Sequence, residues 1–155
     1  MKMAKPIIVL TIICLITSAA LAMTNAKTKD TIAKVNKQTI KDAQAMVLPK
    51  GTKGQAIQGV AKSFGGDLTV MVGVDEKGAI TGVTVTDHAD TPGLGTKAHD
   101  PGYLKMYIGK TAKDLNNLKE NNIKDNKSLD TITGATISSN GVYHAIQKAM
   151  SKGGK

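Results

Sequence analysis

The apolar segment near the N-terminus limits most strongly what this chain can fold into. From Pro6 to Met23 the sequence is apolar apart from a few Thr and Ser residues, and Lys2 and Lys5 precede it. Its length of 18 residues lies near the lower limit for a helix that crosses a membrane. We therefore expect residues 1–26 to form either a transmembrane anchor or a secretory signal.

The flanks of this segment are compatible with both interpretations. A secretory signal is favoured by the order of Lys, apolar and small residues and by Ala20-Leu21-Ala22, which resembles a signal-peptidase site. The apolar run is longer than the usual signal core, so we favour an uncleaved single-pass anchor. Lysines also follow the run, and the positive charges therefore leave its orientation undefined. With the N-terminus inside, the rest of the chain lies on the extracytoplasmic side of the cytoplasmic membrane.

A polar, Lys-rich segment with a helical rhythm follows the anchor. Its apolar residues, among them Ile32, Val35 and Ile40, recur close to one face at 3.6 residues per turn. The rhythm ends at Leu48-Pro49-Lys50-Gly51, where Pro and Gly form a stop signal. We predict a helical stalk over residues 27–50 that joins the anchor to a domain over residues 51–155.

Charge and composition exclude several classes of function. The net charge is +9, all 21 basic residues are Lys, only 3% of residues are aromatic, and Trp is absent. Proteins that bind nucleic acids usually depend on Arg and on stacking aromatic side chains, so we expect no nucleic-acid partner. Cys14 has no partner for a disulfide, and the three His residues share no metal-ligand spacing. The scattered lysines indicate a solvated surface that suits anionic lipid or an acidic protein.

The first regular structure of the domain is a predicted β-hairpin. Over residues 68–74 Leu and Val alternate with Thr, Met and Gly, which is the period of a half-buried strand. A Glu-Lys-Gly turn at 76–78 separates this run from a second one at 80–85. The pattern predicts two antiparallel strands.

Helices are predicted after the hairpin. Asp100-Pro101-Gly102 introduces a short helix, and Ser138-Ser139-Asn140 supplies the side chains that cap helix N-termini. Apolar residues behind this cap have the spacing of an amphipathic helix: Val142, Ala145, Ile146, Ala149 and Met150. We therefore expect an α+β fold in which helices flank a small twisted antiparallel sheet.

The first candidate binding segment is the loop Thr91-Pro92-Gly93-Leu94-Gly95-Thr96, which follows Asp90. Pro92 and Gly93 are suited to a tight turn, and Gly95 permits close approach of the backbone. Leu94 either packs back into the core or lies flat against a planar aromatic ring. Composition alone leaves both possibilities open.

The second candidate segment runs from Asp130 to Asn140 and leads into the final helix. Five hydroxyl side chains occur within nine residues, at Thr131, Thr133, Thr136, Ser138 and Ser139. A helix N-terminus offers free N–H groups and the positive end of the helix dipole, so it favours a phosphate group. Capping requires only one or two hydroxyls, and this excess points to a phosphate site. A P-loop is excluded because Gly134 is not followed by Gly-Lys-Ser/Thr.

These two segments carry a resemblance to a known family. Asp130-x-x-Thr133-Gly134-Ala135-Thr136, placed 35 residues after Gly95, resembles the FMN-binding domain family. Within that family the chain looks most like the G subunits of Rnf complexes, which transfer electrons between ferredoxin and NAD and pump ions. The C subunits of sodium-pumping NADH:quinone reductases are more distant. The resemblance covers residues 65–150, and the anchor and stalk are arranged as in those subunits.

The resemblance implies a cofactor and the residues that hold it. In the family the Thr after Gly-Ala carries FMN as a phosphoester, which corresponds to Thr136. A flavin transferase attaches the FMN from FAD with Mg²⁺ and releases AMP. Asp130 and Thr133, with Gly134 and Ala135, belong to the sequence that the transferase recognises, and the segment from Thr91 to Thr96 holds the isoalloxazine, with Leu94 against the ring.

The implied function is electron relay with the other membrane subunits of a redox complex, not catalysis by this chain alone. Family members usually have room for more strands than the 15 residues between Pro49 and Gly65, so the first half of the sheet stays unassigned. Two alternatives stay open: a stand-alone extracytoplasmic flavoprotein and a cofactor-free membrane-anchored binding module. A hydrolase with Thr136 or a Ser as nucleophile is disfavoured because His144 lies about two turns along the same helix, with no carboxylate evidently placed to orient it.

Overall fold

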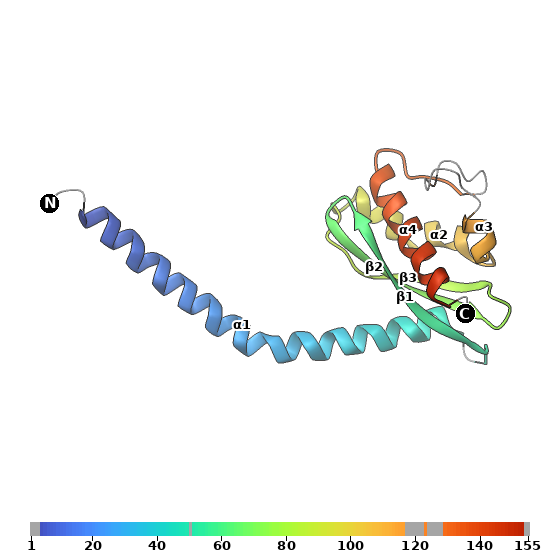
Figure 1. Ribbon diagram of the computed structural model, residues 1–155, viewed down its shortest axis with the longest axis horizontal. Coiled ribbons are helices and arrows are strands. Elements are labelled where there is room, and N and C mark those ends of the chain that lie inside the picture. The colour runs from blue at the N-terminus through green and yellow to red at the C-terminus, as the bar shows by residue number, and fades with distance from the viewer. Residues whose placement is uncertain (1–3, 50, 117–122, 124–128, 154–155) are drawn as a thin grey trace. The chain divides into compact units, whose positions relative to one another are not determined.

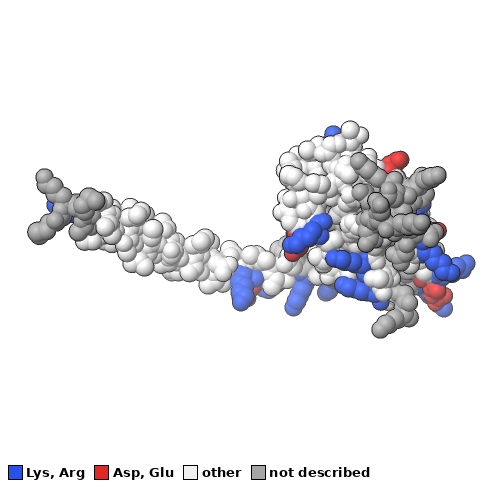
Figure 2. Space-filling model, turned by 45° about the horizontal axis from the view of Figure 1, so that its top comes forward, with Lys and Arg blue, Asp and Glu red and all other residues white. Residues whose placement is uncertain are grey.

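The computed structural model describes residues 4–49, 51–116, 123 and 129–153 (Figure 1). The chain divides into two compact units, Met1–Gln38 and Thr39–Lys155. Among the described residues, Lys side chains occur both along the N-terminal helix and on the surface of the domain, as one face of the molecule shows (Figure 2).

A single helix, α1 (Ala4–Val47), runs through both the predicted anchor and the predicted stalk. It contains an 18-residue window of mean hydropathy 2.5, none of which is buried within the structure. By length and composition it can cross a membrane, although an N-terminal signal sequence has the same properties. Polar side chains in the apolar stretch are satisfied locally, since the hydroxyls of Thr11 and Thr17 each donate to the carbonyl four residues earlier at 2.9 Å.

The domain contains a three-stranded antiparallel sheet in the order β1-β2-β3. Its strands are β1 (Gly54–Ser63), β2 (Gly66–Asp75) and β3 (Ile80–Asp87). The predicted hairpin is confirmed as β2 and β3. Strand β1 was not predicted, and it fills the short interval between Pro49 and Gly65 that the sequence left unassigned. The sheet with its helices confirms the expected α+β fold.

One face of the sheet forms the core with the final helix, α4 (Thr136–Gly153). The even-numbered residues of β2 from Leu68 to Val74 are buried on this face, as the alternating pattern predicts. Strand β1 passes very close to the helix, because a Cβ atom on Gly59 would lie 1.9 Å from the carbonyl oxygen of Ala145. All five residues of the predicted helical stripe are buried: Val142, Ala145, Ile146, Ala149 and Met150.

The opposite face of the sheet packs against the last turns of α1. Val47 and Ala43 are buried there with Met71. Gly73 and Gly82 are paired across β2 and β3, and a side chain at Gly73 would meet the carbonyl oxygen of Val47 at 2.1 Å. The hydroxyl of Thr81 donates to the same carbonyl at 2.6 Å. The glycine pair therefore makes room for the C-terminus of α1. The Thr81 hydroxyl provides a hydrogen-bond donor for the Val47 carbonyl at this helix end.

Short helices connect β3 to the second candidate segment. They are η1 (Gly95–His99), α2 (Pro101–Leu104), η2 (Lys105–Tyr107) and α3 (Ala112–Asn116). The predicted short helix is confirmed as α2, and the Asp100 carboxylate caps it by accepting from the Gly102 amide at 2.7 Å. Leu115 within α3 and Ile123 beyond it are both buried. Leu118, the apolar residue between these two in the sequence, lies outside the described residues.

The predicted cap of the last helix was wrong in position. Helix α4 begins at Thr136, so Ser138 and Ser139 lie in its first turn instead of before it. Both are buried. The hydroxyl of Ser139 accepts from the Ile132 amide and donates to the Ala135 carbonyl, each at 3.1 Å. Ser139 therefore holds the preceding turn onto the helix, and Thr136 is the first helical residue.

Candidate functional site

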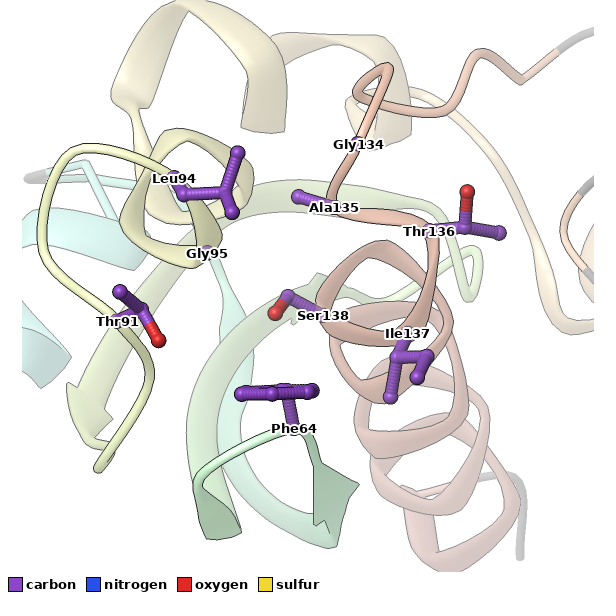
Figure 3. A pocket seen from close by; sticks show the side chains of 9 residues that line it. All are labelled: Phe64, Thr91, Leu94, Gly95, Gly134, Ala135, Thr136, Ile137 and Ser138. Atoms are coloured by element: carbon purple, nitrogen blue, oxygen red, sulfur yellow. The ribbon is translucent and has the colours of Figure 1, made fainter.

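The two predicted binding segments meet at one pocket. The pocket has a volume of about 240 Å³ and is open to the surface. Figure 3 shows its lining: Leu94, Gly95 and Thr91 on one side, the start of α4 on another, and the ring of Phe64 opposite Leu94. Nine residues line it: Phe64, Thr91, Leu94, Gly95, Gly134, Ala135, Thr136, Ile137 and Ser138.

A tight turn delivers Thr136 to the pocket. The Ala135 amide donates to the Ile132 carbonyl at 2.9 Å, and Gly134 has a φ of +81°. This is the backbone of a type II turn, whose third residue requires a positive φ and therefore favours Gly. The chain then enters α4 directly at Thr136, which explains why Gly precedes Ala and Thr in this segment.

Thr136 occupies the N-terminus of α4 at the rim of the pocket. It is half-buried, and its hydroxyl points away from Leu94 and Phe64 (Figure 3). The first amides of an α-helix have no partner within the helix, and the helix dipole adds positive potential at this end. An anionic group joined to the Thr136 hydroxyl would therefore lie in a favourable field.

The first loop presents Leu94 to the same pocket. The Thr91 carbonyl accepts from the amides of Leu94 and Thr96, both at 3.3 Å. Gly93 has a φ of +74°, and its amide donates to the Thr96 hydroxyl at 2.9 Å. These bonds fold the loop so that Leu94 stands at its tip with 44% of its surface exposed. The alternative that Leu94 packs into the core is therefore wrong.

Gly95 brings the two segments into contact. A Cβ atom at this position would lie 2.8 Å from the Ser138 hydroxyl and 2.9 Å from the Asp90 Cβ. Only Gly allows the loop to approach the first turn of α4 so closely. The close approach of the backbone that the sequence predicts at Gly95 is present.

Large apolar side chains surround the pocket without filling it. Phe64 is 66% exposed, Ile137 is 57% exposed and Leu94 is 44% exposed. Exposed apolar residues that converge on one concavity indicate a binding site for an apolar group. The hydroxyls of Thr91 and Ser138 add polar groups to this lining.

The predicted site residues fall into three groups: those that line the pocket, those that shape a loop, and those that lie outside the pocket. Thr91, Leu94, Gly95, Gly134, Ala135 and Thr136 line the pocket. Pro92, Gly93 and Thr96 instead shape the loop that carries Leu94. Thr133 and Asp130 are exposed and do not line the pocket. The Asp130 carbonyl accepts from the Tyr103 hydroxyl at 2.8 Å, which fixes the start of the second segment.

Among the lining residues, Phe64 lay outside both candidate segments, whereas Ile137 and Ser138 lay in the second segment but were not named as cofactor contacts. The relevant signal was that the chain contains a single Phe, placed between Ser63 and two glycines. An apolar residue at the tip of a Gly-rich turn is a candidate ligand contact. Ile137 and Ser138 follow from the helix start at Thr136, which the sequence placed too late.

A buried carboxylate supports the first loop. The Asp90 side chain is fully buried, and it accepts from the Ser63 hydroxyl at 2.6 and 2.7 Å and from the Gly65 amide at 2.9 Å. Burial alone would raise the pKa of Asp90, but the hydrogen bonds from Ser63, Gly65 and His99 outweigh it and hold the pKa below its ordinary value. Asp90 is therefore ionised at neutral pH.

His99 completes this cluster. Its Nε2 atom lies 3.0 Å from the Asp90 carboxylate, and its ring packs against the ring of His88 at a centroid distance of 4.3 Å, with the two planes tilted by 57°. Burial lowers the pKa of His99 and the charge of His88 lowers it further, against the opposing effect of Asp90. A neutral His99 therefore donates from Nε2 to Asp90, and its Nδ1 atom is buried without a partner among the described residues.

Comparison with family models identifies the domain. The model of the FMN-binding domain matches residues 63–151. This chain belongs to the FMN-binding domain family. The matched residues include both loops, the unpredicted Phe64 and nearly all of α4, and they begin at the last residue of β1.

Curated relatives share similarity over most of the chain. The G subunit of the ion-translocating oxidoreductase complex of Aliivibrio fischeri is 28% identical, covering 96% of this chain and 89% of that protein. The G subunit of the Na⁺-translocating ferredoxin:NAD⁺ oxidoreductase complex of Acetobacterium woodii is 26% identical, with 92% and 87% covered. The crystal structure of Shewanella oneidensis NqrC has a TM-score of 0.49 at 27% identity and covers 61% of this chain and 47% of that one.

The residues of the pocket fit FMN by their chemistry. FMN combines a planar aromatic ring with a phosphate, and the pocket combines apolar walls at Leu94 and Ile137 with a helix N-terminus at Thr136. A Cβ atom on Gly134 or Gly95 would narrow the space between the two loops. Both ends of the cofactor therefore have a suitable counterpart within one concavity.

Proposed function

We propose that this chain is the electron-relaying G subunit of a membrane-bound, ion-translocating ferredoxin:NAD oxidoreductase, and that it carries FMN as a phosphoester on Thr136. The observation that supports this most strongly is that Thr136, the first residue of α4, lines the same pocket as Leu94. Relatives named as G subunits of ion-translocating complexes, similar over nearly the whole chain, support the cellular role.

Attachment of FMN requires a reactive hydroxyl at a chain position that a transferase can reach. Thr136 is only half-buried, and its hydroxyl points outward from the rim. In the proposed reaction the Thr136 oxygen attacks the FMN phosphorus of FAD, the bond between that phosphorus and the oxygen bridging to AMP breaks, and AMP leaves. The hydroxyl proton passes to solvent, and Mg²⁺ held by the transferase neutralises the phosphates. No oxidant or reductant takes part.

Each part of the pocket has a role in holding the attached group. The amides at the start of α4 bind the phosphate oxygens, and the positive end of the helix dipole stabilises their charge. Leu94 and Ile137 exclude water from the ring, and the hydroxyls of Thr91 and Ser138 offer hydrogen bonds near its polar edge. When bound, FMN supplies one-electron and two-electron transfer, which no side chain of this domain provides.

The setting of the site is part of the proposal. Helix α1 anchors the chain in the cytoplasmic membrane, and the flavin domain lies on the extracytoplasmic side. The anchor keeps the pocket near the other membrane subunits of the redox complex, with which it exchanges electrons. Co-purification of these subunits from native membranes with tagged full-length chain tests this part, and recovery of the chain alone would contradict it.

Covalent attachment is tested by expressing the full chain with an active flavin transferase and viewing the denatured protein on a gel under ultraviolet light. We expect a fluorescent wild-type band that is absent in Thr136→Ala. The matched control is Thr131→Ala, which removes a half-buried hydroxyl from the same segment and is expected to leave the band. A dark wild-type band, with the transferase shown to be active on another substrate, would contradict the proposal.

A further inference from the structure

We infer that Phe64 forms the wall of the flavin pocket opposite Leu94, and that Asp90 is the positioning residue that holds it there. The inference rests on the proposed function and concerns how the ring is enclosed. It assigns a role to a turn outside both candidate segments, the Ser63–Gly66 connection between β1 and β2.

Phe64 is a large apolar residue that lies mostly exposed at the pocket. With 66% of its surface exposed it is the most exposed apolar residue of the pocket, and no other Phe or Trp occurs in the chain. In Figure 3 its flat ring faces the pocket from the side opposite Leu94, with Ser138 between them. Aromatic rings stack favourably on one another, and contact with a planar ligand would remove this apolar surface from water.

The turn that carries Phe64 is fixed on both sides by one carboxylate. Asp90 accepts from the hydroxyl of Ser63, the residue before Phe64, at 2.6 and 2.7 Å. It also accepts from the amide of Gly65, the residue after Phe64, at 2.9 Å. The Phe64 side chain between these two bonds lines the pocket and is mostly exposed. Phe64 is therefore exposed but held in place, unlike an apolar residue on a loose loop.

Backbone packing reinforces the same arrangement. A Cβ atom on Gly65 would lie 1.8 Å from the carbonyl oxygen of Ala89, so the turn rests directly on the chain beside Asp90. Asp90 is followed at once by Thr91, which begins the loop that presents Leu94. The same carboxylate therefore ties the Phe64 turn to the Leu94 loop, and it fixes the separation of the two walls.

The energetic case for Asp90 comes from its burial. A buried ionised carboxylate needs hydrogen-bond donors, and Asp90 receives them from Ser63, Gly65 and His99. Moving the Phe64 turn would leave this carboxylate without two of these donors, and an unsatisfied buried acceptor is strongly unfavourable. The observed position of the turn that carries Phe64 is therefore stabilised by the hydrogen bonds to Asp90.

The first experiment measures how well iodide reaches the native flavin. The full chain is flavinylated and solubilised in detergent, and the quenching of flavin fluorescence by iodide is compared in wild type, Phe64→Ala and Ile108→Ala. Since Trp is absent, no indole quenches the flavin. Ile108 is the control because it is 50% exposed and does not line the pocket.

We expect the quenching constant to rise about twofold in Phe64→Ala, because one of the two ring faces becomes open, and to stay at the wild-type value in Ile108→Ala. Equal quenching in Phe64→Ala and wild type would overturn the inference and would assign the exposed Phe64 to a protein partner. The constant is measured only on chains that carry flavin, as the denatured band shows. A dark denatured wild-type band contradicts the proposed function, whereas a bright band with unchanged quenching contradicts this inference alone.

The second experiment tests the positioning role of Asp90. Asp90→Asn and Ser63→Ala each weaken the tie to the turn, and both are expected to raise iodide quenching. Combined with Phe64→Ala, neither is expected to raise it further, because both act through Phe64. The positioning role would be contradicted if Asp90→Asn or Ser63→Ala alone left iodide quenching unchanged. It would also be contradicted if either substitution raised quenching further in the Phe64→Ala background.

Ser63→Ala provides the result if Asp90→Asn does not fold, because it keeps the buried carboxylate and its two other donors. Its matched control is Ser151→Ala, which removes an exposed hydroxyl bonded to the Lys148 carbonyl at 2.9 Å. Ser151 does not line the pocket. We expect the iodide quenching constant of the control to equal that of wild type. A higher constant in Ser63→Ala is then due to loss of the hydrogen bond to Asp90.

Discussion

Leu94 and Gly134 are neighbours in space although they belong to two separate loops. A Cβ atom on Gly134 would lie 3.5 Å from the Leu94 Cδ1 atom. The turn that delivers Thr136 and the loop tip that presents Leu94 are therefore adjacent, and the position of one affects the other. This proximity connects Thr136, the proposed point of flavin attachment, with Leu94, the residue proposed to lie against the flavin ring.

The turn at Gly134 is expected to control flavin attachment. Gly134→Ala forces a side chain into a φ of +81°, which costs about 1–2 kcal/mol. To relieve this strain the turn shifts, and Thr136 leaves its place at the start of α4. We expect in-gel flavin fluorescence to fall severalfold per amount of protein.

The control for this variant is Gly78→Ala, in the turn between β2 and β3. Gly78 has nearly the same φ, +80°, and a Cβ atom at this position would have no atom within 4 Å. Thermal unfolding should show a similar loss of stability in both variants, with flavin attachment lost only in Gly134→Ala. If flavin attachment were equal in the two variants, the Gly134 turn would not control the attachment of the cofactor.

His99 is expected to make the domain less stable in mild acid. Its folded pKa is below the ordinary value of 6.5, so below that pH the unfolded chain binds more protons than the folded one. The contribution of His99 to the free energy of unfolding is therefore fully present above the pKa of the unfolded state, and it is lost as the pH falls toward the pKa of the folded state. Asp90, whose pKa is lowered from 3.8, contributes only at more acidic pH.

The measurement is the free energy of unfolding by denaturant between about pH 5 and pH 8, in wild type and in His99→Gln. Gln keeps a donor toward Asp90 but does not titrate, so the slope with pH should become shallower in the variant. His88, whose ring packs against that of His99, is unchanged in both chains. The same slope in both proteins would show that His99 does not titrate as described.

The close contact of β1 with α4 is expected to be sensitive to volume. In Gly59→Ala the added Cβ would lie 1.9 Å from the Ala145 carbonyl oxygen, which forces the strand away from the helix. Overpacking of this kind costs about 1–3 kcal/mol. Gln58→Ala, at the exposed neighbouring position, should change the free energy of unfolding by less than about 0.5 kcal/mol. A neutral Gly59→Ala would contradict the packing of β1 on α4.

The hairpin and the last helix could be predicted because their patterns are local. Residues 68–74 alternate between two environments, and Val142 to Met150 repeat at helical spacing, so each run alone specifies its period and its buried face. Strand β1 could not be predicted in this way. Its core-facing position at Gly59 carries no side chain, because α4 lies against the backbone there, and the apolar alternation is lost.

The site was partly predictable for a similar reason. Hydroxyls and glycines in the two candidate segments indicated a binding function before any contact was known, and resemblance to a family supplied the role of Thr136. Phe64 could not be assigned, since its importance depends on the Asp90 carboxylate, which lies 26 residues further along the chain. The start of α4 was placed too late because Ser138 and Ser139 resemble caps, whereas Ser139 binds the preceding turn from within the helix.

Tandem mass spectrometry of proteolytic peptides tests the central claim most directly. The full chain, expressed with an active flavin transferase, is digested, and the peptide that contains Thr131, Thr133 and Thr136 is fragmented. We predict that the mass of FMN, less one water, is found on Thr136 and on no other hydroxyl residue of this peptide. An unmodified peptide, or FMN located on Thr131 or Thr133, would contradict the account.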